Sequence, residues 1–262
     1  MRPVQVHGHR GARAVLPENT MAAFEYAIDR GVDAIEMDVV VTKDDVPVIS
    51  HDPITNPMIC SSPDGRRAYI RMLTFAELRN WDCGSLVNPQ FPKQTPVPGA
   101  RIPSLDEVLA LADRGSFLFN IEVKMCRPEI DPAPGRVAKL VLESIDRRKL
   151  RRRVIVQSFD FRVLLAMRAV APDIRRAALY EDPRLGDFVS VARTAGAGVI
   201  APHKKMVTTA QVAAAHDENM PVIPWTANTP EEWDALIACG VDGIITDDPA
   251  ALISYLEQKG LR

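Results

Sequence analysis

Strand-like and helix-like segments alternate along almost the whole chain, and this alternation limits the possible folds more than any other feature. Short apolar segments rich in β-branched residues predict eight strands, at residues 4–9, 34–41, 117–124, 154–157, 176–180, 198–201, 221–225 and 243–246. Eight βα units in 262 residues predict a TIM (β/α)8 barrel, an α/β fold. A doubly wound sheet fits less well, because no G-x-G-x-x-G turn follows the first strand.

Helical patterns follow most of the expected strands. They cover residues 19–30, 104–114, 135–149, 160–170, 185–195, 208–219, 230–239 and 249–259. Asn19, Ser104 and Asp160 are suitable N-caps, and Pro230 and Pro249 suit the first turns of their helices. The helix boundaries therefore support the same barrel.

One segment interrupts the alternation. Residues 53–101 are rich in Pro, Asn and Ser, and within them residues 73–81 have a helical pattern with Thr74 as its candidate cap. A long segment of this kind is either disordered or functional, and its embedded aromatic residues favour order. We expect one domain, residues 1–262, with a small insertion at residues 53–101 that caps the active-site face.

Charge and cysteine usage exclude several classes of protein. The net charge of -2 provides no basic surface for nucleic acid. No apolar stretch reaches transmembrane length and the first residues do not resemble a signal peptide, so we expect no stable membrane insertion and a cytoplasmic location. The four cysteines have neither C-x-x-C nor zinc-site spacing, and reduced thiols are the simpler expectation for Cys60, Cys83, Cys126 and Cys239.

A pair of carboxylates lies within the second expected strand. Glu36 and Asp38 are two residues apart and share one face, while Met37 points to the other. On an exposed edge strand such a pair would be solvated and held by surface lysines. Here the strand continues as three valines, which favours burial, and buried carboxylates need a partner. Their oxygens suit Mg²⁺ or Ca²⁺.

Polar residues stand at one predicted strand end after another, where a barrel carries its reactive groups. They are His9, Arg10, Glu36, Asp38, Glu122, Lys124, Gln157, His203 and Trp225. A barrel with a purely structural role has no need of such a set.

Glu122 and Lys124 repeat the spacing of the first pair. Glu122 provides a third carboxylate for a cation, whereas Lys124 and Arg10 provide positive charges for an anion. With His9 and His51, a residue type suited to acid/base catalysis, the set indicates cleavage of a phosphate ester. A salt bridge from Lys124 to Glu122 alone is the simpler alternative for that lysine.

The order of these motifs resembles the glycerophosphodiester phosphodiesterase family over the whole chain. The motifs are His9-Arg10-Gly11, Pro17-Glu18-Asn19-Thr20, Glu36-Met37-Asp38, His51-Asp52-Pro53, Ile121-Glu122-Val123-Lys124, Ile102-Pro103-Ser104-Leu105, Pro224-Trp225-Thr226-Ala227-Asn228 and Gly243-Ile244-Ile245-Thr246-Asp247-Asp248-Pro249. The resemblance implies a TIM barrel that uses a divalent cation to hydrolyse a glycerophosphodiester to glycerol 3-phosphate and an alcohol such as choline or ethanolamine.

The resemblance also implies a role for each matching residue. His9 and His51 match the acid/base pair, and Arg10 and Lys124 match the phosphate-binding residues. The matches to the metal ligands are Glu36, Asp38 and Glu122. All these positions carry the residue type that the family's pattern requires.

Five further residues have weaker signals. Glu18 either orients Arg10, contacts the glycerol or only caps a helix, and Trp225 either walls the glycerol pocket or only packs. His203 either lines the mouth of the site or lies in an exposed loop. We expect His7 in the barrel core and His216 on the surface.

Three other functions remain open from the residues. A phospholipase D-like or phosphatidylinositol-cleaving enzyme could share the barrel, although no apolar membrane-docking segment is present. A Schiff-base aldolase could use Lys124 but leaves the carboxylates and histidines without a role. A phosphate-binding protein without catalysis does not need two histidines.

Overall fold

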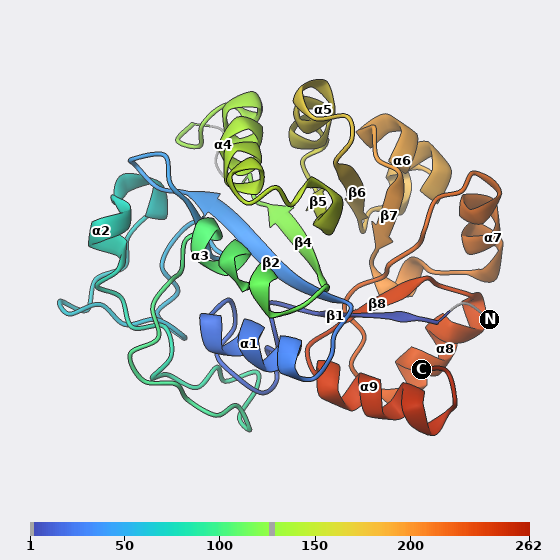
Figure 1. Cartoon of the computed structure of the whole chain (residues 1–262), viewed down its shortest axis with the longest axis horizontal. Helices are drawn as coiled ribbons and strands as arrows, with labels where there is room; N and C mark the ends of the chain where they lie inside the picture. The colour runs from blue at the N-terminus through green and yellow to red at the C-terminus, as the bar shows by residue number, and fades with distance from the viewer. Residues whose placement is uncertain (1–2, 126–128) are drawn as a thin grey trace.

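The barrel is built from parallel strands that pair in a curled sheet (Figure 1). The computed structural model describes residues 3–125 and 129–262. The pairing order is β7-β6-β5-β4-β2-β1-β8. The strands are β1 (Gln5–Gly8), β2 (Ala34–Val41), β4 (Leu118–Val123), β5 (Val154–Ser158), β6 (Arg175–Tyr180), β7 (Val199–Pro202) and β8 (Gly243–Thr246). This arrangement confirms the predicted (β/α)8 barrel.

The seventh predicted strand, residues 221–225, is not a continuous strand. It forms two isolated parallel bridges, one from Val222 to Ile200 of β7 and one from Trp225 to His203, the residue after β7. On its other side the Ile245 N–H of β8 donates to the Pro224 carbonyl at 2.9 Å. The segment closes the barrel between β7 and β8. Its two prolines have no N–H groups, so it cannot complete a regular ladder of hydrogen bonds.

The predicted helices surround the sheet with boundaries shifted by a few residues. They are α1 (Met21–Asp29), α3 (Leu105–Leu109) with the 3₁₀ turn η2 (Ala110–Arg114), α4 (Pro134–Arg147), α5 (Phe161–Val170), α6 (Phe188–Ala195), α7 (Thr209–Asp217), α8 (Pro230–Cys239) and α9 (Pro249–Gln258). Shorter 3₁₀ turns are η1 (Ile70–Met72), η3 (Arg151–Arg153), η4 (Pro183–Leu185) and η5 (Lys204–Met206). Most lie in the loops between barrel units.

Most of the predicted caps are confirmed. The Ser104 and Asp160 side chains accept hydrogen bonds from the first turns of α3 and α5, and Pro230 and Pro249 begin α8 and α9. The assignment of Asn19 is wrong, because the Thr20 hydroxyl caps α1. The side chain of Asn19 donates instead to Asp38 at 2.8 Å, so this residue belongs to the site.

A short antiparallel strand was not predicted. β3 (Pro47–Ile49) pairs with the end of β2, with Val40 opposite Val48. Three residues are too few to display an alternating pattern. The tight turn before β3, in which Asp45 has a φ of 61°, brings the chain back so that His51 lies near the barrel mouth.

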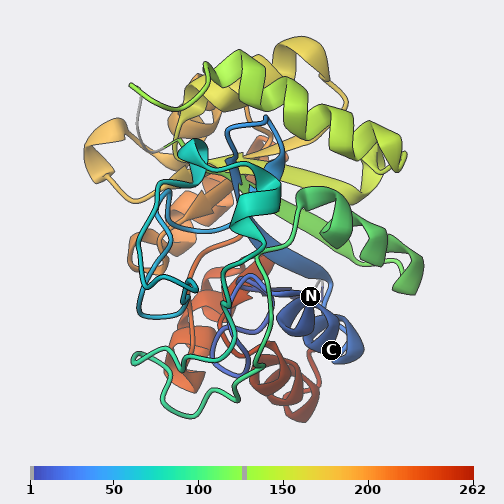
Figure 2. The ribbon, with the colours of Figure 1, turned by 90° about the vertical axis from the view of Figure 1, so that its left-hand side faces the viewer.

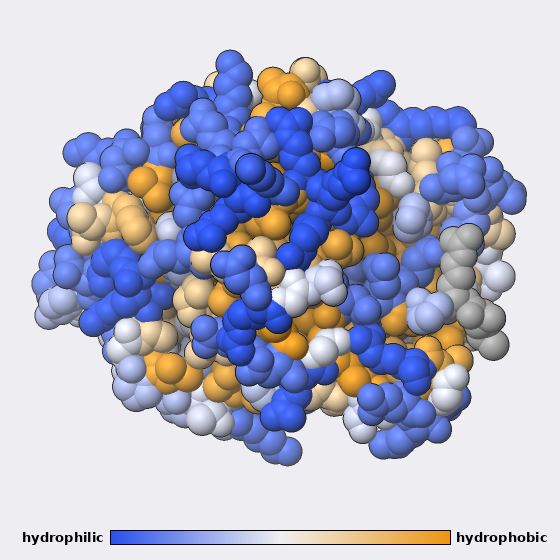
Figure 3. All heavy atoms as spheres, in the orientation of Figure 1, coloured by the Kyte–Doolittle hydropathy of each residue, from blue (hydrophilic) through white to orange (hydrophobic). Residues whose placement is uncertain are grey.

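The main core fills the space between the sheet and the surrounding helices, and a smaller group of apolar side chains fills the barrel interior. That interior group is Ile155, Ala177, Leu179, Val199, Ala201, Ile223 and Ile245. On the face drawn in Figure 3, hydrophilic residues cover much of the surface, with scattered apolar patches between them. Within residues 3–125 and 129–262, no helix has the length and apolar content that crossing a membrane requires.

The segment of residues 53–101 is ordered and lies on one side of the barrel (Figure 2). Its helix α2 (Phe75–Leu78) is shorter than predicted but has Thr74 as its cap. Leu73, Leu78 and Trp81 pack with Val40 and Val48 of the β2–β3 pair in a separate apolar cluster. This cluster anchors the segment to the sheet.

The expectation of reduced cysteines is wrong for one pair. Cys60 and Cys83 form a disulfide across 23 residues of this segment. The sequence offered no spacing signal for the pair, because backbone pairing of Ser61 with Asp82 brings the two cysteines together. Cys239 is free, whereas Cys126 lies outside the described residues. The cytoplasmic location stays a prediction, and the disulfide removes one of its premises.

Candidate active site

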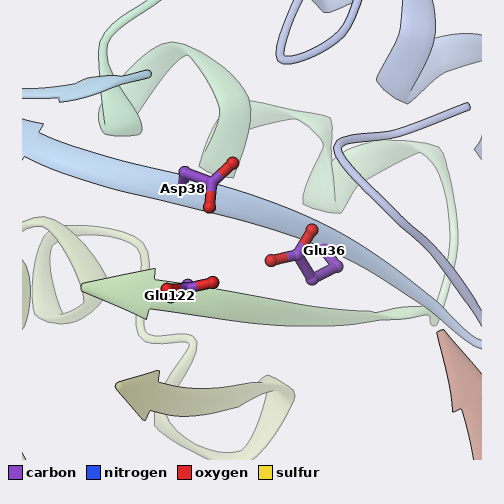
Figure 4. A group of neighbouring side chains, drawn as sticks. All are labelled: Glu36, Asp38 and Glu122. Atoms are coloured by element: carbon purple, nitrogen blue, oxygen red, sulfur yellow. The ribbon is translucent and has the colours of Figure 1, made fainter. Parts of the chain in front are cut away.

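Three buried carboxylates gather on two neighbouring strands. Glu36 and Asp38 project from β2 and Glu122 from β4, with Asp38 directly opposite Glu122 in the parallel register (Figure 4). Each residue offers one oxygen, and these oxygens lie within 4.8 Å of one another. Their residues are 1%, 0% and 6% exposed, so they cannot all ionise without a compensating charge.

Two cations lie beside the carboxylates. The Lys124 ammonium is 3.1 Å from Asp38 Oδ1 and 2.5 Å from Glu122 Oε1, and Arg10 Nε is 3.2 Å from Asp38 Oδ2. Lys124 therefore contacts two carboxylates, and the simpler alternative of a bridge to Glu122 alone is wrong. Asp38 Oδ1 and Glu122 Oε1 accept no hydrogen bond of good geometry within the described chain, which leaves lone pairs for a cation.

The charges divide unequally among the carboxylates. Burial alone would raise the pKa of Asp38, but the positive charges of Lys124 and Arg10 outweigh it and hold this pKa below its ordinary value. Burial raises the pKa of Glu36 well above its ordinary range, and the charges of Asp38 and Glu122 raise it further. Burial raises the pKa of Glu122 in spite of Lys124. The cluster therefore lacks positive charge mainly at Glu36, which fits a hard divalent cation.

The turn after β1 holds Arg10 against the cluster. Arg10 has a φ of 49°, and its backbone N–H donates to Glu36 Oε2 at 2.9 Å. A Cβ on Gly8 would lie 2.2 Å from the Gly11 carbonyl oxygen, and one on Gly11 would lie 2.6 Å from the Ala23 carbonyl carbon. Only glycine fits at both positions, so the turn can pack tightly between the barrel and α1.

Each of the two histidines is oriented by a carboxylate. His9 Nδ1 lies 2.5 Å from Asp247 Oδ1, and Asn228 donates to the other oxygen of Asp247 at 2.7 Å. His51 Nδ1 lies 2.9 Å from Asp52 Oδ1. In both cases Nε2 is left for the cavity. Burial lowers the pKa of His9, and its hydrogen bond to Asp247 opposes this shift only in part.

These groups line a cavity of about 190 Å³ at the carboxyl ends of the strands. Phe159, Leu179, Trp225 and Ile245 form its apolar wall. The Phe159 and Trp225 rings meet edge to face, with centroids 5.4 Å apart. A larger cavity of about 390 Å³, with Val4 and Asp242 in its wall, contains none of the candidate site residues. The smaller cavity is therefore the candidate active site, because the candidate carboxylates, cations and histidines line it and not the larger one.

The sequence model of the Glycerophosphoryl diester phosphodiesterase family matches residues 9–251. The chain belongs to this family. It is 32% identical over 255 residues to a glycerophosphodiester phosphodiesterase of Caldanaerobacter subterraneus subsp. tengcongensis, with 97% of this chain and 98% of the relative covered. A glycerophosphodiester phosphodiesterase of Bacillus altitudinis is 33% identical, with coverage of 97% and 98%.

Solved structures agree with the sequence comparison. A Silicibacter pomeroyi protein, provisionally named a glycerophosphoryl diester phosphodiesterase, superimposes with a TM-score of 0.92 at 33% identity, covering 99% of this chain and 95% of that one. An Oleispira antarctica phosphodiesterase, solved with the product sn-glycerol-3-phosphate, shares the fold with a TM-score of 0.83 at 23% identity and 97% coverage of both chains. The chain is thus a phosphodiester hydrolase of this family.

The structure brings most of the predicted site residues of this glycerophosphodiesterase together. The cavity is lined by His9, Arg10, Glu36, His51, Glu122, Lys124 and Trp225, and Asp38 lies directly behind them. Glu18 accepts from Arg10 at 2.6 Å, which supports orientation of Arg10, while Thr20 does the capping. His203 does not line this cavity, and its ring contacts Trp225 at a centroid distance of 5.1 Å.

Several residues of the site had been given no role from the sequence. Asp52 and Asp247 orient the histidines, although both occur in the quoted motifs. Gln157 donates to Glu36 at 3.2 Å and accepts from Asn120 at 3.2 Å. A polar residue facing inward from an otherwise apolar strand was the available signal for Asn120. His7 is fully buried within reach of Asn120, as expected.

Proposed function

We propose that this chain hydrolyses glycerophosphodiesters to sn-glycerol 3-phosphate and an alcohol, using bound Mg²⁺ or Ca²⁺. The observation that carries the proposal is the buried carboxylate cluster beside Arg10 and Lys124, flanked by two histidine–carboxylate pairs. The product named for the Oleispira antarctica relative supports the same reaction.

Glu36, Asp38 and Glu122 would hold the cation. All three are oxygen ligands, which favours Mg²⁺ or Ca²⁺ over Zn²⁺. When bound, the ion supplies Lewis-acid stabilisation for negative charge on phosphate oxygens. Arg10 and Lys124 bind the same phosphate from the protein side and neutralise the charge that develops during cleavage.

His9 and His51 divide the proton transfers. One histidine accepts the proton of the attacking oxygen, which belongs to water or to the substrate's own glycerol hydroxyl. The other histidine donates a proton to the leaving alcohol oxygen as the P–O bond breaks. Asp247 and Asp52 keep Nδ1 engaged, so that Nε2 carries out the transfer in each case.

The remaining candidates have supporting roles. Glu18 fixes Arg10, and Trp225 forms the apolar wall against the carbon chain of the glycerol. His203 acts only by packing against Trp225. Residues 53–101 form a cap on the catalytic face of a single domain, because several of them lie beside His51.

Turnover of glycerophosphocholine by the full-length chain with added Mg²⁺ or Ca²⁺ tests the proposal. We expect glycerol 3-phosphate and choline as products and loss of activity on chelation, with recovery when the metal is restored. Full activity after exhaustive EDTA dialysis would contradict the carboxylate site. Cleavage restricted to lipid in liposomes would favour a lipid-cleaving enzyme instead.

The aldolase alternative has less support. A Schiff-base lysine needs a neutral amine, which burial or a nearby cation provides. Lys124 instead lies between two carboxylates, and although burial opposes them their charges raise its pKa. Borohydride trapping of a carbonyl substrate on Lys124 would reverse this judgement.

A further inference from the structure

A second cavity, of about 320 Å³, opens beside the catalytic pocket. It lies between the turn after β1 and the residues 53–101 segment, which contributes Asn56, Met58 and Gln90 to its wall. Arg10, Arg13 and His51 line both cavities. A phosphodiester has two arms, and a phosphate held at Arg10 can therefore direct one arm into each cavity.

Charges in the wall of the second cavity are paired with one another. Glu18 accepts from Arg10 at 2.6 Å and from Arg13 at 2.5 Å. Asp52 pairs with His51 at 2.9 Å. Asn56 Nδ2 donates to the other oxygen of Asp52 at 3.0 Å, so both carboxylates of the wall are held by neighbouring side chains. A positively charged guest would find no carboxylate without a partner there and would meet two arginines.

The uncharged polar groups of the wall are amides. Gln90 Oε1 accepts from Arg13 at 3.0 Å, while Gln90 Nε2 donates to none of the described residues. Asn56 and Asn88 also line the cavity. Amides both donate and accept hydrogen bonds, as hydroxyl groups do. A wall of this kind therefore complements an alcohol with several hydroxyls.

The two cavities differ in whether aromatic residues line their walls. Trp225 and Phe159 line the catalytic pocket, whereas the part of the second cavity's wall that the structure describes contains no aromatic residue. The nearby Phe91 ring is occupied by the Arg13 guanidinium, 4.9 Å from its centroid. Trimethylammonium groups bind best to aromatic faces or to carboxylates without partners, and the described residues of this wall offer neither.

We propose that the second cavity holds the leaving alcohol and selects uncharged polyols, such as glycerol or inositol, over choline. This assignment rests on the proposed phosphodiesterase function and adds the class of alcohol. Arg13 and Gln90 determine the specificity. The arginine disfavours a cationic headgroup, and the amide binds hydroxyls.

The first test is the substrate preference of the metal-supplemented wild-type chain. We expect kcat/KM for glycerophosphoglycerol and glycerophosphoinositol to exceed that for glycerophosphocholine by about tenfold, which corresponds to about 1.4 kcal/mol of differential binding in this partly open cavity. Equal values, or a preference for choline, would overturn the assignment while leaving the phosphodiesterase function intact. If no diester is hydrolysed, the proposed function itself fails.

The second test changes one charge in the wall. Gln90→Glu adds a carboxylate facing the cavity, and we expect the choline-to-inositol ratio of kcat/KM to rise about fivefold, as for a partly exposed charge pair. Lys93→Gln is the matched control, because it makes the same charge change three residues away at an exposed position outside the cavity wall. Thermal unfolding checks that both variants are folded.

The contrast between the two variants decides the second test. A shift in the ratio for Gln90→Glu but not for Lys93→Gln supports the assignment. Equal shifts would indicate a general electrostatic effect of the loop and would overturn it. No shift in either variant would place the leaving alcohol elsewhere.

Discussion

The two sides of the site are built differently. On the barrel side, Glu36 and Asp38 are almost completely buried and each has partners on neighbouring strands. On the other side, the side chains of His51 and Asp52 are 38% and 41% exposed and follow the short strand β3 into a loop. Strand register fixes the first group, whereas a loop, a small apolar cluster and a disulfide hold the second.

This difference indicates which side chains of the site must be held rigidly. Carboxylates that share a cation must be held at fixed distances, and buried strands provide them. A residue that meets substrates entering from solvent can be carried by a loop. Substitutions on the barrel side should therefore have larger and more specific effects than those on the loop side.

The largest effect is expected in the carboxylate cluster. Glu36→Gln and Asp38→Asn should each lower kcat by about 10³-fold or more, because each removes a proposed metal ligand. In chelator their stabilities should differ. Glu36→Gln relieves crowding with Asp38 and Glu122, so it should be at least as stable as wild type. Asp38→Asn leaves Arg10 and Lys124 under-compensated and should be less stable.

Thermal unfolding with EDTA and with added Mg²⁺ or Ca²⁺ measures this contrast. Wild type should gain stability with metal, and neither variant should. If both variants lose equal stability in chelator, the unequal division of charge within the cluster is incorrect.

A smaller difference is expected between the two histidine–carboxylate pairs. Asp247→Asn should lower kcat by about 10²-fold, because the His9 side chain is only 13% exposed and no other side chain of the described residues orients it. Asp52→Asn should cost about tenfold, since water can reach half-exposed His51. Single-turnover assays with glycerophosphocholine provide the comparison. Equal losses would mean that exposure does not distinguish the pairs.

The barrel interior also predicts a pH effect on stability. Burial lowers the pKa of His7 to about 4, from about 6.5 when unfolded. Between these values the unfolded chain binds more protons, so stability is complete above pH 6.5 and is lost as the pH falls toward 4. At pH 5 the loss due to His7 is about 2 kcal/mol. Urea unfolding of His7→Asn should show a correspondingly shallower pH dependence, and an unchanged slope would contradict this origin.

The smallest effect on the barrel is expected from the disulfide. Cys60→Ser opens a loop of 23 residues, and closing such a loop stabilises by about 3 kcal/mol. Because the loop lies within the residues 53–101 segment, that segment should become sensitive to limited proteolysis while the barrel's unfolding temperature stays nearly constant. Activity should fall only a few-fold. Cys239→Ser, at the free cysteine of α8, is the control and should change neither property.

The contrast between residues held by strands and residues held by loops also explains how much could be predicted from the sequence. The strands carrying Glu36, Asp38 and Glu122 were predicted because β-branched runs and a period of two are local signals. The grouping at one barrel end followed from the parallel topology alone. Asp247 was missed as the partner of His9 because the two residues are 238 positions apart and meet only when β1 pairs with β8.

Features that depend on loops were less predictable. The Cys60–Cys83 pair, the strand β3 and the position of His203 all depend on how loops pack, for which the sequence contains no periodic pattern. Asn19 was assigned as a cap because its side chain suits that role, but its Nδ2 donates to the Asp38 carboxylate and its Oδ1 accepts from the Asp38 backbone N–H. Tertiary contacts replaced the local preference there.

The prolines in the closing segment, residues 221–225, make amide exchange uneven around the barrel. Pro221 and Pro224 have no exchangeable hydrogen, and only short isolated bridges tie this segment to β7. Its remaining amides, including that of Trp225, should exchange with deuterium faster than those of β4, which has continuous ladders on both sides. We expect the aromatic wall of the pocket to fluctuate while the carboxylate wall stays fixed, an arrangement that would admit substrates of different bulk without disturbing the proposed metal ligands.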